Sequence, residues 1–359
     1  MPAISIMIKP ASGRCNLRCK YCFYHDLTKN REIADYGIMD IDTAKRIIDS
    51  AVDFAKGDNI YFTFQGGEPL LAGKEYFLRF FEHARQKNKD GNIFYFLQTN
   101  GTLLDKEWIK IFKDNSVFIG LSSDGDEEGN RFRLDASGKS AFDRISKAAT
   151  MLKEGEIDFN ILTVVTGYTA ENIQRIYRYF TSQGYKYLQF IPCLRPIGDK
   201  SESELYMTVP QYEKFLSQLF SLYVKDYADG NYTSVRYFDN MVRMYLGQRA
   251  EQCGMEGHCS RQLVVESNGN VYTCDFYCTD EWLLGNINTS DLAYIASCEK
   301  AKKFVFESLQ INPQCATCGY FNLCRGGGCK RQKSDRDYCG AYKSFFSKNM
   351  RLFEIFSKH

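Results

Sequence analysis

The chain has 359 residues, of which 44% are hydrophobic and 25% are charged, and its formal net charge is +2 at pH 7. This composition excludes a disordered or collagen-like chain and leaves room for one large domain with a smaller one. Lysine and arginine are spread along the chain and form no basic arm, so we expect no nucleic-acid partner.

The 14 cysteines stand out in this composition. No apolar run approaches the roughly 20 residues that cross a bilayer, and the N-terminus lacks the long apolar stretch of a secretory signal. We therefore expect a cytoplasmic protein with no membrane partner. In a reducing compartment, a cysteine-rich pattern indicates metal binding or catalysis and not disulfides.

Six short runs rich in β-branched and aromatic residues predict strands at residues 4–8, 60–64, 93–97, 117–121, 159–165 and 187–191. Amphipathic periodicity predicts helices between them, at residues 75–88, 106–113, 142–153 and 173–182, and in a first helix capped by Asp42. This alternation predicts a parallel sheet, because parallel neighbours need crossover connections. Polar or glycine-rich segments follow nearly every strand, which favours an α/β partial (β/α)6 barrel over an open sheet.

After about residue 201 the alternation stops. Helical patterns at residues 211–227 and 238–246 lead to a region with ten cysteines between residues 253 and 339 and only a short strand signal at 263–266. We expect bound clusters to hold this region together in place of a large core. The predicted domains are a barrel at residues 1–235 and a cysteine-rich domain at residues 236–359 that ends in an amphipathic helix at 341–357.

Cys15, Cys19 and Cys22 form a C-x3-C-x2-C pattern after the first predicted strand. Three thiolates can hold three irons of a [4Fe–4S] cluster, which leaves the fourth iron open to another ligand. A zinc site is the alternative, but structural zinc takes four ligands and usually pairs its cysteines as C-x2-C.

With Tyr21 before the last of these cysteines, the pattern resembles the signature of the radical S-adenosylmethionine (SAM) superfamily. The glycine-rich turn after the second predicted strand resembles that superfamily's GGEP motif. The resemblance implies that SAM chelates the open iron and that its one-electron reduction yields a radical that abstracts a substrate hydrogen. The implied SAM contacts are Tyr21, Gly66, Gly67, Glu68, Pro69, Gln98, Asn100, Ser122 and Asp124. For Asp124, a polar turn at a strand end stays an open alternative.

The later cysteines resemble those of the SPASM domain, which binds two auxiliary [4Fe–4S] clusters in peptide-modifying radical SAM enzymes. The resemblance assigns Cys253, Cys259, Cys274 and Cys329 to one cluster, and Cys315, Cys318, Cys324 and Cys339 to the other. Three [4Fe–4S] clusters and SAM are thus the expected cofactors. A pair of zinc ribbons is the alternative for this region. Cys193, Cys278 and Cys298 lie outside the scheme.

Within the superfamily the chain resembles the anaerobic sulfatase-maturating enzymes, which oxidise a Cys or Ser of a sulfatase to Cα-formylglycine. The likeness is carried by IKPAS (8–12), CFYH (22–25), FQGGEP (64–69), LQTNGT (97–102), FNIL (159–162), LQFI (188–191) and YTCDFY (272–277). It implies that Asp275 is the catalytic base and that Tyr24 and Gln65 bind substrate. The implied partners are a peptide or protein substrate and a reduced flavodoxin- or ferredoxin-type electron donor.

Two rival functions remain at this point. The same machinery serves maturases of ribosomal peptides that form a thioether or carbon–carbon crosslink. A non-catalytic iron–sulfur electron-transfer protein is the rival of another class. A tRNA-modifying radical enzyme is disfavoured by the missing basic surface.

Overall fold

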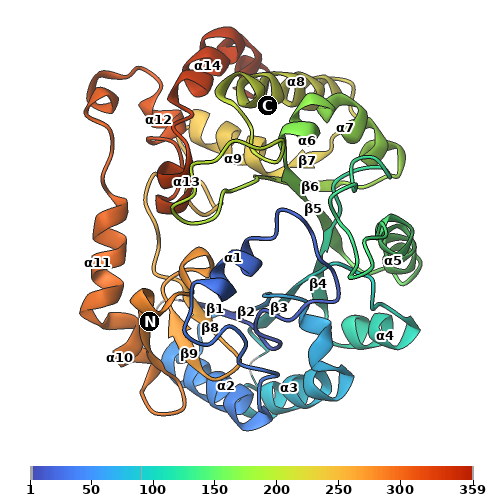
Figure 1. Cartoon of the computed structure of the whole chain (residues 1–359), viewed down its shortest axis with the longest axis vertical. Helices are drawn as coiled ribbons and strands as arrows, with labels where there is room; N and C mark the ends of the chain where they lie inside the picture. The colour runs from blue at the N-terminus through green and yellow to red at the C-terminus, as the bar shows by residue number, and fades with distance from the viewer. Residues whose placement is uncertain (1–2, 90, 358–359) are drawn as a thin grey trace. The chain divides into compact units, whose positions relative to one another are not determined.

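The computed structural model describes residues 3–89 and 91–357, and the chain forms two compact units (Figure 1). The first unit comprises Met1–Ser122, Arg133–Phe159 and Arg261–Phe304, and the second comprises Ser123–Phe132, Asn160–Ser260 and Val305–His359. The units alternate along the chain, and the predicted domain boundary after residue 235 stays a prediction.

A sheet forms the centre of the first unit, with its strands in the order β10-β9-β8-β1-β2-β3-β4. The strands are β1 Ile4–Ile8, β2 Ile60–Phe64, β3 Ile93–Thr99, β4 Val117–Ser122, β8 Leu263–Val265, β9 Asn270–Tyr272 and β10 Leu283–Asn286. All neighbours from β8 to β4 are parallel, and Ile8 lies opposite Phe64 on one side and Val265 on the other. β9 and β10 continue the sheet in antiparallel fashion. The parallel pairing of the first four predicted strands is confirmed.

Helices and 3-10 turns connect these strands. They are α1 Phe23–Lys29, α2 Ile41–Ala55, η1 Pro69–Ala72, α3 Lys74–Lys87, α4 Lys106–Asp114, α5 Phe142–Glu154, η2 Asp275–Tyr277, η3 Asp280–Trp282, α10 Leu292–Ser297 and α11 Glu299–Ser308. Asp40 caps α2 by accepting the N–H of Asp42 at 2.7 Å, so the prediction of Asp42 as the cap is wrong. Figure 1 shows α2 and α3 side by side along the sheet.

Aromatic rings fill the space between the sheet and α3. Phe62 and Phe64 of β2 meet Phe80 of α3 edge-on, with ring centroids 5.3 and 4.9 Å apart. All three side chains are fully buried. Edge-to-face pairs of this kind add a small geometric preference to the large apolar area that each ring removes from water. This core holds β2, and therefore the loop that follows β2, in a fixed position.

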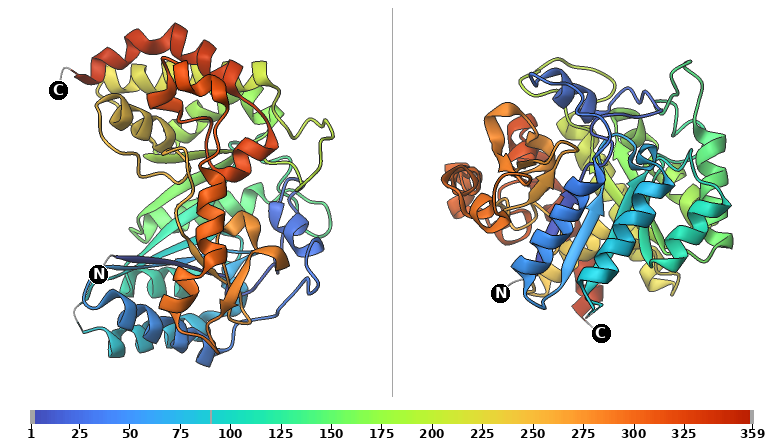
Figure 2. Two further views of the ribbon diagram at one scale, coloured as in Figure 1. Left: turned by 90° about the vertical axis from the view of Figure 1, so that its left-hand side faces the viewer. Right: turned by 90° about the horizontal axis from the view of Figure 1, so that it is seen from below.

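The second unit has three parallel strands in the order β5 Phe159–Val165, β6 Tyr187–Pro192 and β7 Ser234–Val235. Its helices and turns are α6 Gly167–Glu171, α7 Ile173–Ser182, α8 Val209–Ala228, α9 Arg236–Tyr245, η4 Pro313–Thr317, α12 Phe321–Cys324, α13 Lys330–Asp335, α14 Cys339–Phe353 and η5 Glu354–Ser357. α14 packs along α8 (Figure 2). Between these two helices, the hydroxyls of Tyr212 and Tyr342 lie 3.0 Å apart. Among the residues that the structure describes, no helix combines the length and apolar character needed to span a membrane.

Replacing Phe80 with alanine tests the aromatic core. The change is expected to lower the free energy of unfolding by about 3–5 kcal/mol, because removal of the Phe80 ring leaves a cavity among its packed neighbours. Leu78, on the same helix, is 46% exposed. Leu78→Ala is therefore the matched control and should change that free energy by less than about 0.5 kcal/mol. Anaerobic thermal unfolding followed by circular dichroism compares the two variants, and equal shifts would contradict the prediction.

Candidate active site

Two loops at the carboxyl ends of neighbouring parallel strands are joined through their backbones. The cysteine loop, residues 9–22, follows β1, and the glycine turn, residues 65–69, follows β2. The N–H groups of Gly67 and Glu68 donate to the carbonyl oxygens of Ser12 and Arg14 at 2.9 and 2.7 Å. A Cβ on Gly67 would lie 1.9 Å from the Arg14 oxygen, so only glycine permits this approach. The glycine turn therefore fixes the chain immediately before Cys15.

Glu68 joins the glycine turn to the end of β3. One carboxylate oxygen accepts the N–H of Leu70 at 3.1 Å and the hydroxyl of Thr99 at 2.8 Å, and the other accepts the N–H of Asn100 at 2.8 Å. Burial raises the pKa of Glu68 to about 7, although the three donors act to lower it. This positioning role was not predicted from the sequence, and the contact of Glu68 with SAM stays a prediction. Pro69 follows as the first residue of η1.

Nitrogen donors surround the first sulfur of the cysteine loop. The N–H of Leu17 donates to Cys15 Sγ at 3.3 Å, and Asn100 Nδ2 lies 3.7 Å from the same sulfur. Burial raises the pKa of Cys15 to about 11, and it also raises the pKa of Cys22. The positive irons of a cluster would offset this cost of ionising the thiols. A loop with three half-buried cysteines and N–H donors at one sulfur therefore fits an iron–sulfur cluster.

Other predicted SAM contacts lie at the ends of β2, β3 and β4. Gln98 Nε2 donates to Ser122 Oγ at 2.8 Å and so joins β3 to β4. The guanidinium of Arg133 lies 5.5 Å from the ring centroid of Tyr21. Gly66 has φ of +126°, which a side chain would strain. Gln98 and Ser122 thus lie on neighbouring parallel strands, whereas Tyr21 belongs to the cysteine loop and Gly66 to the glycine turn.

Asp124, which follows β4 in the chain, belongs to the second unit. It is 1% exposed, and its Oδ1 accepts the N–H of Val164 at 2.9 Å. Its own N–H donates to Asn130 Oδ1 at 3.0 Å. These bonds are those of a structured turn, which was the open alternative for this residue. A contact between Asp124 and SAM stays a prediction.

The predicted base, Asp275, lies in the first unit together with both predicted substrate-binding residues. Its Oδ2 accepts the Tyr24 hydroxyl at 2.6 Å and Gln65 Nε2 at 3.1 Å. Its Oδ1 forms an ion pair with Lys9 Nζ at 3.0 Å. The sequence presented Asp275, Tyr24 and Gln65 as separate candidates. In the structure, Tyr24 and Gln65 both contact the buried carboxylate of Asp275. Such a group can accept a proton from a substrate that reaches Oδ2.

Buried charges next to Asp275 were missed in the sequence. Lys9 Nζ also lies 3.6 Å from Glu266 and 3.2 Å from the sulfur of Cys278, and Glu266 pairs with Arg31 at 2.6 Å. Burial lowers the pKa of Lys9, but the charges of Asp275, Cys278 and Glu266 outweigh it and raise that pKa above its ordinary value. Lys9 and Glu266 each directly follow a parallel strand. Their positions at the carboxyl ends of strands were the signal in the sequence that could have identified them as candidate site residues.

Four cysteines of the second unit surround one cavity. It has a volume of about 220 Å³ and is lined by Cys315, Cys318, Cys324 and Cys339 together with other residues of the segment 310–343. Burial is the main cause that raises the pKa of Cys324, and the neighbouring thiols add to the shift. Four thiols around one cavity fit a cluster with all its irons ligated by protein. This set is the second auxiliary group predicted from the sequence.

The other predicted auxiliary group is divided between the units. Cys253, Cys259 and Cys329 belong to the second unit, and Cys274 lies in the first, directly before Asp275. The N–H of Lys330 donates to Cys259 Sγ at 3.5 Å. A Cβ on Gly254 would lie 2.9 Å from that of Cys329, so a glycine permits close approach of the chain here as well. Three of the four predicted ligands are thus carried by adjoining segments.

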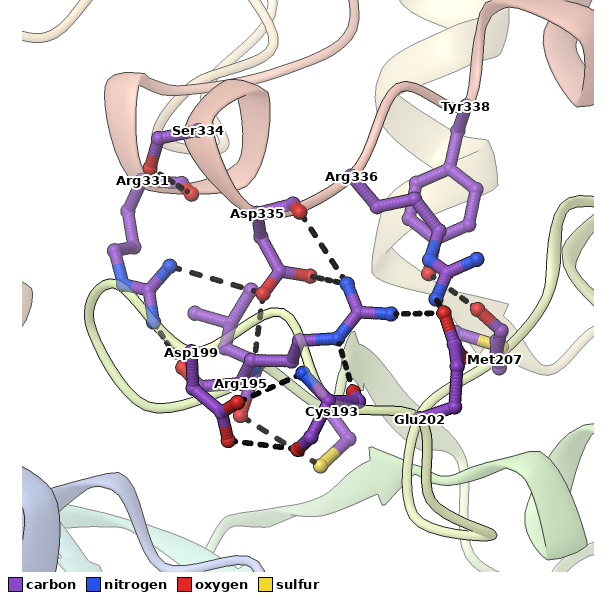
Figure 3. Close-up of polar contacts among 12 residues, drawn as sticks. Cys193, Arg195, Asp199, Glu202, Met207, Arg331, Ser334, Asp335, Arg336 and Tyr338 are labelled. Atoms are coloured by element: carbon purple, nitrogen blue, oxygen red, sulfur yellow. Dashed lines mark hydrogen bonds and ion pairs between the residues drawn. The ribbon is translucent and has the colours of Figure 1, made fainter.

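A network of charges anchors α13, which lies between two predicted cluster ligands (Figure 3). Arg195, in the loop after β6, donates its backbone N–H to Asp335 Oδ1 at 2.9 Å and its guanidinium N–H to Glu202 at 3.2 Å. Arg331 donates in turn to the carbonyl oxygen of Arg195. The side chains of Arg195 and Asp335 are each 5% exposed. Breaking a buried pair of this kind is costly, so α13 is held firmly to this loop.

Comparison with known proteins gives concordant matches along the chain. The Radical SAM superfamily model matches residues 10–180, and the SPASM model, an iron–sulfur cluster-binding domain, matches residues 253–319. A cysteine-type anaerobic sulfatase-maturating enzyme of Clostridium perfringens (strain 13 / Type A) is 43% identical over 96% of each chain. A serine-type enzyme of Bacteroides thetaiotaomicron is 27% identical over 89% of this chain and 81% of its own. The structure of native anSMEcpe with bound AdoMet and Cp18Cys peptide matches with a TM-score of 0.93 and 39% identity over 99% of both chains.

These matches confirm the predicted fold class, an α/β partial barrel of the radical SAM type with a C-terminal SPASM domain. They also decide the ligand chemistry, because the cysteine-rich segment matches an iron–sulfur domain and the zinc-ribbon alternative is therefore wrong. The predicted cofactors, SAM and three [4Fe–4S] clusters, are confirmed by the two domains together. The matched relatives are enzymes, which removes the reading of a non-catalytic electron carrier.

Gly67→Ala tests the contact between the glycine turn and the cysteine loop. The added Cβ forces the two segments apart, so we expect less iron in the SAM-binding cluster and weaker SAM binding. Gly73→Ala is the control for backbone strain without a clash, because Gly73 has φ of +86° and nothing lies within 4 Å of an added Cβ. Iron analysis and EPR spectra recorded with and without SAM measure both effects. Equal iron content and an equal response to SAM in the two variants would show that the close approach is unimportant.

Proposed function

Because the chain belongs to the anaerobic sulfatase-maturating enzymes of the radical SAM superfamily, we propose that it oxidises a cysteine side chain of a sulfatase-type substrate to Cα-formylglycine. The observation that carries the proposal is the buried Asp275 carboxylate, which contacts Tyr24, Gln65 and Lys9. In the sequence, Asp275 directly follows the predicted cluster ligand Cys274. The preference for cysteine over serine is supported by the 43% identity to a cysteine-type enzyme, against 27% for a serine-type one.

We assign the SAM-binding cluster to Cys15, Cys19 and Cys22. Support comes from the N–H donors at Cys15 and from the glycine turn that fixes the chain before it. When bound, SAM and this cluster supply abstraction of a hydrogen atom from the substrate. The chain's own part is to hold SAM at the ends of β1 to β4. The proposed contacts are Tyr21, Gly66, Gly67, Glu68, Pro69, Gln98, Asn100, Ser122 and Asp124.

The substrate cysteine must lose one Cβ hydrogen atom, its thiol proton and one further electron to become a thioaldehyde. Water then converts the thioaldehyde to formylglycine and releases hydrogen sulfide. Asp275 is the proposed acceptor of the thiol proton, since a carboxylate within hydrogen-bonding distance of an S–H can act as a general base. Tyr24 and Gln65 both donate to Oδ2 and so fix the position of this oxygen. A substrate thiol that reaches Oδ2 therefore finds the proton acceptor already in place.

When bound, the auxiliary clusters would supply an acceptor for the remaining electron. Cys253, Cys259, Cys274 and Cys329 are assigned to one of them, and Cys315, Cys318, Cys324 and Cys339 to the other. With all irons ligated by thiolates, these clusters suit electron transfer. We also propose a reduced flavodoxin- or ferredoxin-type electron donor and a cytoplasmic location, which the cysteine content supports. We further propose a domain boundary after residue 235, which lies between the two matched domains.

Mass spectrometry of a Cys-x-Pro-x-Arg peptide tests the activity. After anaerobic incubation with the reconstituted enzyme, SAM and a reductant, we expect the cysteine to become formylglycine with release of hydrogen sulfide. The matching serine peptide is expected to react more slowly. Asp275→Asn should lower formylglycine formation by about 100-fold or more, because the amide cannot take the proton.

The outcomes of this experiment separate the candidate functions. SAM cleavage to 5′-deoxyadenosine without any peptide oxidation would keep a radical enzyme but overturn sulfatase maturation. A thioether or carbon–carbon crosslink in a peptide substrate would favour the rival maturase. Undiminished formylglycine formation by Asp275→Asn would leave the reaction in place and remove Asp275 as its base.

Cys324→Ala tests the proposed auxiliary cluster in the 220 Å³ cavity. Loss of one of four ligands is expected to lower the iron content and the yield of formylglycine for each SAM cleaved. Cys298→Ala is the control, because Cys298 is a half-buried thiol at the end of α10 outside both ligand sets. Iron and sulfide analysis with product ratios compares them. Equal iron content in the two variants would argue against Cys324 as a ligand.

A further inference from the structure

Lys9 offers a cation to the carboxylate oxygen of the proposed base that Tyr24 and Gln65 do not contact. Its Nζ lies 3.0 Å from Asp275 Oδ1, whereas Tyr24 and Gln65 both contact Oδ2. The two carboxylate oxygens are therefore held by different partners. A carboxylate with only Oδ2 held could still turn about its Cβ–Cγ bond, and the attraction between the Lys9 ammonium and Oδ1 opposes that rotation.

The surroundings of Lys9 keep its side chain in this place. Lys9 is 1% exposed, and its Nζ also contacts Glu266 Oε1 at 3.6 Å and Cys278 Sγ at 3.2 Å. The Tyr24 ring lies 4.5 Å from the ammonium nitrogen. Each contact favours the charged ammonium, and a buried cation without these partners would be strongly disfavoured. The lysine is thus both held and charged.

We propose that Lys9 is a positioning residue for the thiol-deprotonation step: it fixes the orientation of the Asp275 carboxylate so that Oδ2 meets the substrate thiol. The inference rests on the proposed function, in which Asp275 takes the proton of the substrate S–H. Lys9 itself takes no proton and touches no substrate. Its loss leaves hydrogen abstraction in place and slows the step that makes the product, so SAM is consumed without formylglycine.

Arg31 provides a matched control for this idea. It is a buried cation that pairs with Glu266 at 2.6 Å, one ion pair away from Lys9, and its guanidinium also donates to the carbonyl oxygen of Ala34. Arg31→Met removes a buried positive charge from the same network while leaving the Lys9–Asp275 pair intact. A purely structural role for these charges predicts similar effects for both cations, and positioning of Asp275 predicts an effect for Lys9 alone.

The experiment measures formylglycine formed for each 5′-deoxyadenosine released by the holoenzyme. We expect Lys9→Met to lower this ratio by about 10–100-fold with little change in the KM for the peptide, and Arg31→Met to leave the ratio within about twofold of the wild type. Lys9→Arg keeps the buried charge but carries a planar fork in place of a compact ammonium, so its ratio should be intermediate. If Lys9→Met does not fold or load clusters, Lys9→Arg decides the matter.

Crystal structures of the variants give a second readout that needs no substrate. An Asp275 side chain that keeps the wild-type orientation in Lys9→Met overturns the proposal, as does a wild-type product ratio in either variant. An equal loss in Arg31→Met would assign the effect to the stability of the network. The wild-type enzyme tests the proposed function separately, because failure to form any formylglycine would overturn that function. In that case, the orientation of Asp275 in the variant crystal structures would still test the role of Lys9.

Discussion

Parallel pairing of β8 with β1 is the contact on which the candidate site depends. It sets Val265 opposite Ile8, and the residues that follow these two strands are Glu266 and Lys9. The carboxyl ends of parallel strands open on the same edge of a sheet. One backbone ladder therefore brings together a lysine near the N-terminus and carboxylates from the cysteine-rich part of the chain. The ion pairs of Lys9 with Glu266 and Asp275 are consequences of that register.

Local patterns were sufficient to predict the first half of the fold. The strands at residues 4–8 and 60–64 have the predicted bounds, because each is a short apolar run between polar loops. The Cys15 loop and the Gly67 turn were also found from spacing, since each motif lies within one short segment. The sequence predicted Asp42 as the cap of α2, whereas the structure has Asp40 in that role. Both are acidic residues near the start of the same apolar pattern, and only the backbone geometry shows which of them caps the helix.

The arrangement around Asp275 could not be predicted in the same way. Tyr24 and Asp275 are 251 residues apart, and no periodicity relates them. Their roles were inferred from a family resemblance, residue by residue, and the resemblance says nothing of Lys9 as a partner. A lysine after an apolar strand is most often exposed, and its burial here becomes intelligible only when Glu266 and Asp275 are placed beside it. The tertiary contact, and not the local pattern, makes that residue type possible.

The separation of Tyr24 from Asp275 also imposes an order of events during synthesis. At a translation rate of about 5–20 residues per second, Asp275 emerges on the order of 10–50 s after Tyr24. For that interval the edge of β1 that later pairs with β8 has no partner from its own chain. An unpaired strand edge can recruit other strands, and Lys9 at its end is the kind of charged residue that discourages such pairing. The ammonium that later meets Asp275 is therefore also the charge at the end of this strand edge until β8 pairs with it.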